Sequence, residues 1–163
     1  MADTADTAEI ERRMQPGAWD GAGFLRPGTS LPAVQAEDAE TTGRLGLDAQ
    51  TIGARLGELL DAAVDSDMGR PVTGGDLRVE LVRARGFLTC PWAPEEFERC
   101  PVGLGGRATA NRFTIIGASG RRLAGYELSA HLIRDHAFFG GPDTRYRLEP
   151  ADVAGVLGLT RAS

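Results

Sequence analysis

Two cysteines and two histidines constrain this chain more than any other feature, because they are the only residues of their types. Cys90, Cys100, His131 and His136 all fall within 47 of the 163 residues. Their pattern is C-x9-C, thirty intervening residues, and then H-x4-H. Two thiolates and two imidazoles form a ligand set that suits tetrahedral zinc. The sequence therefore predicts one structural zinc site with these four residues as its ligands.

The two ligand pairs differ in their spacing. The histidines have the separation found in zinc fingers, but five positions along a helix rotate by about 500° and leave the two imidazoles roughly 140° apart. Both can reach one ion only if the helix loosens near its end, which Gly140 and Gly141 mark. The nine residues between the cysteines exceed the two to four of a zinc knuckle. A proline follows each cysteine and favours an extended backbone there.

The segment 113–136 resembles the hairpin-plus-helix half of a Cys2His2 zinc finger. With the cysteines, the resemblance covers about 50 of the 163 residues, and it implies that both cysteines and both histidines bind structural zinc. The segments LTCPW, ANRFTI and HLIRDHAFF also resemble a bacterial family of small uncharacterised proteins. That second resemblance implies no activity.

Two interpretations compete with a metal site. Cysteine is among the most buried residue types, and His136 shares the apolar helix face of Leu128 and Leu132, so each of the four residues can be an ordinary core residue. A disulfide between Cys90 and Cys100 is the other interpretation, although disulfides are unusual in a reducing cytosol.

Enzymatic chemistry requires a different arrangement of the same residues. Three ligands and a water, with Glu95, Glu96 or Asp135 as a base, would make a hydrolase-type metal site. Cys90 beside His131 would make a thiol nucleophile pair. A site closed by four protein ligands leaves no position for substrate or activated water. We therefore assign no catalytic or cofactor-binding residue other than the metal ligands.

The remainder of the chain predicts an α+β fold, in which a small antiparallel sheet or hairpin packs with two to three helices and includes the finger-like segment. Residues 1–46 are predicted to be an acidic, largely irregular N-terminal arm, and residues 47–163 a single α+β domain with the metal site. The expected elements are a helix over 47–67, a strand over 77–89, a loop over 90–106, a hairpin of 111–117 and 121–127, a helix over 128–139, a short strand over 146–148 and a helix from Pro150.

The N-terminal arm carries large apolar residues that are costly to leave in water. Trp19, Phe24, Leu25 and Leu31 all lie within it. We expect part of the arm to lie against the folded domain or against a partner.

Charge and hydropathy exclude several classes of function. Residues 1–75 hold 6 arginines against 13 acidic residues, whereas residues 76–163 hold 12 against 10. A net charge of +2 on residues 76–163 gives no strong field for a phosphate backbone, which argues against nucleic acid as a partner. No apolar run reaches the roughly 18 residues of a membrane span. The acidic N-terminus MADTADTAEI does not resemble a signal peptide, so we expect a cytoplasmic protein without membrane contact.

These features favour a cytoplasmic, zinc-stabilised binding or regulatory module that acts through contacts with an unidentified protein partner. A small metal- or thiol-dependent enzyme of the hydrolase type is the first alternative. Nucleic-acid binding through the finger-like helix is the second.

Overall fold

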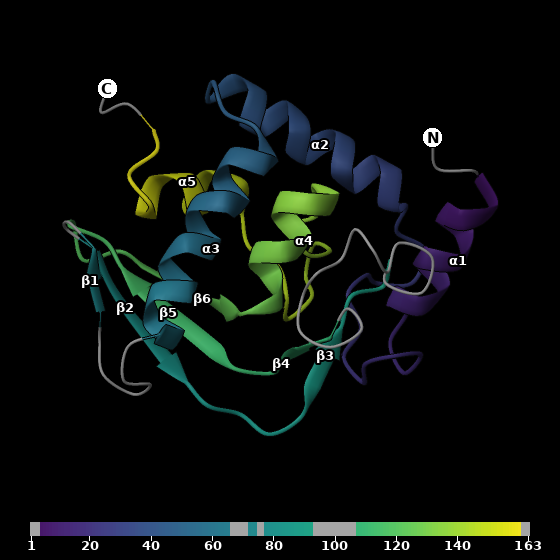
Figure 1. The fold of residues 1–163 in the computed structure, drawn as a ribbon. Coiled ribbons are helices and arrows are strands. Elements are labelled where there is room, and N and C mark those ends of the chain that lie inside the picture. Colours follow the sequence, from purple (N-terminus) through teal and green to yellow (C-terminus); the bar gives the residue numbers. More distant parts are fainter. Residues whose placement is uncertain (1–3, 66–71, 75–76, 93–106, 161–163) are drawn as a thin grey trace.

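The computed structural model describes residues 4–65, 72–74, 77–92 and 107–160, which form helices and antiparallel strands. Figure 1 shows α3, α4 and α5 together on one side of the strands. The predicted α+β class is confirmed. In chain order the elements are α1 (Thr4–Met14), α2 (Leu31–Arg44), α3 (Ala49–Asp65), β1 (Val72–Gly74), β2 (Leu77–Val82), β3 (Phe87–Thr89), β4 (Arg107–Thr109), β5 (Arg112–Ile116), β6 (Arg122–Tyr126), α4 (Leu128–His136) and α5 (Pro150–Val156).

The strands form two sheets. The larger sheet has the order β1-β2-β5-β6 with antiparallel neighbours, and the smaller one pairs β3 with β4. In the larger sheet, Val82 lies opposite Arg112, and Arg112 lies opposite Tyr126. These three residues therefore form one row across β2, β5 and β6, on the face opposite the buried Phe113 and Leu123, and Tyr126 at the end of the row also packs against Tyr146.

The hairpin of β5 and β6 forms as its sequence predicts. The Gly117 amide donates to the Arg121 carbonyl at 2.8 Å, which closes the loop at Ala118-Ser119-Gly120. Gly120 has a φ of +84°, a left-handed conformation that glycine adopts without strain. Strand alternation then places Phe113 and Leu123 in the core.

Helix α3 is also close to its predicted range. The Asp48 carboxylate accepts a hydrogen bond from the Thr51 amide at 2.7 Å and so caps the first turn. Its apolar stripe is buried against the larger sheet and α4. The buried residues of this stripe are Ile52, Leu56, Leu59, Leu60 and Ala63.

Apolar side chains gather in two clusters. The main core joins α3, the larger sheet and α5, whereas the second core joins α1, the segment 24–34, the β3 region and the segment 138–146. Helix α4 contributes to both, with Ala130 and Ile133 in the main core and Leu128 and Leu132 in the second. The helix thus lies between the two cores.

Several predicted elements need correction. Residues 1–46 are not largely irregular, because α1 and α2 form there, and Phe24, Leu25 and Leu31 are buried in the second core. Trp19 remains 40% exposed. The segment 77–89 forms two strands in different sheets instead of one. Residues 146–148 form no strand, although the Leu148 amide donates to the Phe139 carbonyl at 2.8 Å.

Candidate metal centre

Three of the four predicted ligands meet in the structure. Cys90 follows β3 directly, and His131 and His136 lie on α4. One ligand atom from each residue lies within 4.8 Å of the others. Cys90 Sγ is 3.4 Å from His136 Nε2. Cys90 and His131 are buried and His136 is partly buried, so this group can hold a metal ion away from bulk water.

The hydrogen bond at His131 Nδ1 determines which nitrogen faces the centre. Nδ1 lies 2.7 Å from Asp135 Oδ2, one helical turn further along. The pKa of the Asp135 carboxyl lies below its usual value, because hydrogen bonds from Arg134 and His131 outweigh the opposing effect of burial. An ionised carboxylate only accepts hydrogen bonds, so Nδ1 carries the proton. Burial lowers the pKa of His131 more than Asp135 raises it, which favours a neutral ring with a bare Nε2.

His131 Nε2 is a buried nitrogen without a hydrogen-bond partner among the described residues. A buried polar atom left unsatisfied costs about 1–3 kcal/mol. An imidazole whose far nitrogen donates to a carboxylate is the usual arrangement of a metal-binding histidine, since the carboxylate fixes both tautomer and orientation. Asp135 and His131 therefore have the relationship expected of an orienting residue and a ligand.

Packing against aromatic rings sets the position of His136. Its ring stacks on Trp92 with 4.1 Å between centroids and 4° between planes. It lies perpendicular to the His131 ring at a centroid distance of 5.0 Å. Burial lowers the pKa of His136 to about 4, and His131 adds to the shift, so both imidazoles are in the neutral form that binds metals.

The end of α4 allows histidines five positions apart to converge. His136 is the last helical residue, and Ala137 turns into the left-handed region at φ 51°. The Ala137 amide donates to the Ile133 carbonyl at 3.1 Å, which is the αL motif of a helix end, and the Phe138 amide donates to the Leu132 carbonyl at 3.0 Å. The helix thus ends three residues before the predicted Phe139, directly after the second histidine.

The N-terminal helices hold the backbone on both sides of the centre. From α1, Arg13 Nη1 donates to the Pro91 carbonyl at 2.8 Å. From α2, Gln35 Nε2 donates to the His136 carbonyl at 2.7 Å. Neither contact has a local signal in the sequence, because the partners are 78 and 101 residues apart.

The other residues predicted as a ligand or as a base are Cys100, Glu95, Glu96 and Asp135. Cys100, Glu95 and Glu96 lie outside the described residues. Asp135 is among the described residues, where its carboxylate accepts hydrogen bonds from His131 and Arg134. The i, i+4 spacing of His131 and Asp135 is the sequence signal for that role, and the Trp92 of CPW is the signal for stacking.

Comparison with protein-family models, with curated proteins and with solved structures finds no match to this chain. The resemblance to a zinc finger therefore stays a prediction. Among the described residues, no helix has both the length and the apolar character needed to cross a membrane.

Proposed function

We propose that Cys90, His131 and His136 bind one zinc ion that stabilises the fold of a cytoplasmic module acting through protein contacts. The observation that carries this proposal is the bare, buried Nε2 of His131, on a residue that has one ligand atom within 4.8 Å of a donor atom of Cys90 and of His136. A cation at their centre would give that nitrogen its missing partner. Asp135 would hold the ring in place from its other side.

Zinc agrees with the donor types and with their separation. Zinc–sulfur bonds of about 2.3 Å and zinc–nitrogen bonds of about 2.05 Å at a tetrahedral angle place the two donor atoms about 3.6 Å apart. Cys90 Sγ and His136 Nε2 are 3.4 Å apart, so both can bind one ion with little movement. A thiolate with two imidazoles also favours zinc over magnesium or calcium, which prefer oxygen ligands.

Burial supports a structural role over a catalytic one. Cys90 is 0% exposed, so its thiol is out of reach of a substrate in solution. Asp135 Oδ2 accepts hydrogen bonds from His131 and from Arg134, at 2.7 and 2.8 Å, so this carboxylate is engaged with two side chains. Both alternatives that depend on these residues, a thiol nucleophile and a metal hydrolase, are therefore weaker.

Contacts with a protein partner are the second part of the proposal. Phe87 in β3 is 66% exposed and Trp19 is 40% exposed, and large aromatic residues on a surface are typical anchors of protein interfaces. Phe87 lies three residues before Cys90, so a metal-held loop would also fix this side chain.

Elemental analysis of the purified protein tests the metal. We expect about one zinc per chain, because three donors from one chain surround a single position. Cys90→Ser and His131→Gln should each remove most of it. Asp135→Asn should weaken zinc affinity about 10–100-fold in a chelator competition, since it removes the orienting carboxylate. Ser129→Ala is the matched control, because Ser129 is buried on the same helix outside the donor group.

Two further measurements test whether Cys90 binds the metal and whether Cys100 is a fourth ligand. Cobalt substitution should give a sulfur-to-metal charge-transfer band that disappears in Cys90→Ser. Cys100→Ser should leave the band but lower metal affinity if this cysteine is the fourth ligand. Protein without bound metal, or a metal content equal in Cys90→Ser, His131→Gln and Ser129→Ala, would show that the three donors are ordinary core residues.

A further inference from the structure

A second candidate site lies on the opposite face of the larger sheet, away from the helices. A groove of about 550 Å³ is lined by side chains of β2, β5 and β6 and by Arg145 from the segment before α5. The row Val82, Arg112 and Tyr126 crosses its floor. Small-molecule sites have volumes of about 300–1,000 Å³, so the groove matches a compound of nucleotide size.

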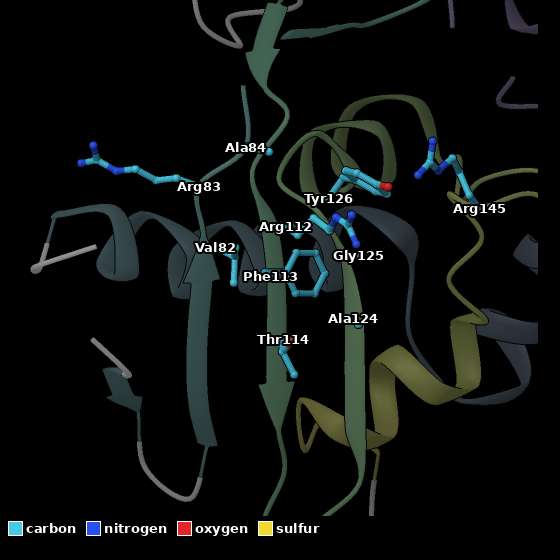
Figure 2. A pocket seen from close by; sticks show the side chains of 10 residues that line it. All are labelled: Val82, Arg83, Ala84, Arg112, Phe113, Thr114, Ala124, Gly125, Tyr126 and Arg145. Atoms are coloured by element: carbon cyan, nitrogen blue, oxygen red, sulfur yellow. The ribbon is translucent and has the colours of Figure 1, made fainter. Parts of the chain in front are cut away.

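Two arginines converge on one aromatic ring in this groove. The guanidinium carbon of Arg112 lies 6.0 Å from the centroid of the Tyr126 ring, and that of Arg145 lies 5.7 Å from it. Figure 2 shows both side chains approaching Tyr126, whereas Arg83 extends away from them. The ring attracts each cation through its electron-rich face, so both guanidinium groups lie beside the same ring.

The positive charges in the groove have no counterion among the described residues. Ion pairs there involve the arginines at 12, 13, 26, 44, 55, 78, 121, 134 and 147, and none involves Arg83, Arg112 or Arg145. Among the residues that the structure describes, no acidic side chain lines the groove. In a chain with a formal net charge of -5, the unpaired Arg112 and Arg145 beside one ring are a local excess of positive charge. An anion placed between them would relieve their mutual repulsion.

The apolar groups beside the arginines would contact the uncharged part of a ligand. Val82, Thr114 and Ala124 line the same groove, and Val82 is 63% exposed. We propose that this groove binds a small organic oxyanion, whose phosphate or carboxylate group bonds to Arg112 and Arg145 and whose apolar body lies on Val82, Thr114 and Ala124. The planar guanidinium fork matches the oxygen geometry of both groups.

The size and the charge of the groove favour a small molecule over a nucleic acid. Nucleic-acid surfaces combine an extended basic stripe with several stacking aromatic residues. Here, within the described part of the chain, Tyr126 is the one aromatic residue at the groove apart from the core residue Phe113. Among the described residues the basic side chains lining it are Arg83, Arg112 and Arg145.

Titration of ¹⁵N-labelled full-length protein with adenosine monophosphate, inorganic phosphate and citrate tests the site. We expect adenosine monophosphate to shift the amide signals of β5, β6 and residues near Arg145, and to bind more tightly than inorganic phosphate because it also covers the apolar floor. The proposal covers both phosphates and carboxylates. If citrate bound at the same residues more tightly than adenosine monophosphate, the ligand would be a carboxylate.

Arg112→Gln and Arg145→Gln should each weaken binding about tenfold, since each removes a charge-assisted hydrogen-bond donor. The matched control is Arg122→Gln, which removes the same charge from an exposed position at the other end of β6, outside the groove. Equal loss in all three variants, or no binding of any probe at millimolar concentration, would overturn the proposal. Binding of a single-stranded oligonucleotide without binding of adenosine monophosphate would also overturn the proposal. The donors of the metal centre lie outside this groove, so a loss of binding in Arg112→Gln or Arg145→Gln does not come from removal of a metal ligand.

Discussion

The contact between α3 and α4 offers a sharp test of how the metal centre is positioned. A Cβ atom added to Gly53 would lie 2.4 Å from the backbone nitrogen of Arg134 and 2.6 Å from its Cα. Arg134 precedes Asp135 on the helix that carries both histidines. Since the nearest atoms are backbone, no side-chain rotation can make room. The two helices must separate by about 0.6 Å or more, because a real Cβ contact is not shorter than 3.0 Å.

Gly57 lies one turn further along α3 and provides the matched control. A Cβ atom there would meet only the Ala130 Cβ, at 4.0 Å, which is an ordinary contact. Both Gly→Ala changes raise helix propensity by about 1 kcal/mol. Overpacking costs about 1–3 kcal/mol and applies only at Gly53, where rigid backbone puts it near the upper end. We therefore expect Gly53→Ala to destabilise by about 2 kcal/mol and Gly57→Ala to stabilise by up to about 1 kcal/mol.

Thermal and denaturant unfolding measure this difference. A change of 1 kcal/mol shifts the Tm of a domain of this size by about 2–4 °C, so the two variants should differ by about 6–12 °C. Gly53→Ala should also bind zinc more weakly in a chelator competition, because a shift of α4 moves His131 and His136 relative to Cys90. If Gly53→Ala proved as stable as Gly57→Ala, the close packing of these helices would be refuted, and with it this account of how the ligands are placed.

Two further substitutions test the helix end and the N-terminal attachment. Ala137→Gly should raise the free energy of unfolding in urea by up to about 1 kcal/mol, because Ala137 holds a φ of 51° that glycine adopts more easily. A lower free energy of unfolding would contradict the left-handed conformation at this helix end. Asp38→Asn should destabilise by about 2–4 kcal/mol, since Asp38 is only 6% exposed and pairs with Arg147 at 2.7 Å. Asp152→Asn is its control, because that pair with Arg121 is exposed and contributes less than about 1 kcal/mol; equal effects would argue against a buried ion pair.

Elements with local signals were predictable from the sequence. The turn at Ala118-Ser119-Gly120 specified the hairpin, the apolar stripe and the Asp48 cap specified α3, and Pro150 opens α5 as expected. Each of these signals lies within a few residues of the element that it forms. The meeting of Cys90 with the histidines was predictable for a different reason, namely that rare metal-binding residue types were concentrated in one part of the chain.

The N-terminal helices were missed because their stabilising contacts are distant in sequence. Helix α2 buries Leu31 and Val34, but it also buries Asp38 and Thr42, so its inner face shows no apolar stripe. Asp38 is buried because it meets Arg147, which follows it by 109 residues. A polar residue that pairs across the fold cannot be distinguished from a solvent-facing one by periodicity alone.

The start of α4 connects the two candidate sites. Tyr126 ends β6 in the groove, Leu128 begins α4, and Glu127 is the one residue between them. The Glu127 carboxylate accepts a hydrogen bond from Thr109 at 2.5 Å, and its amide donates to the Asn111 carbonyl at 3.1 Å, so this junction is held by the β4–β5 segment. An ion bound by His131 would fix α4 within about one turn of this junction. Metal binding on one side of the sheet would therefore also limit the freedom of the ring around which the arginines gather on the other.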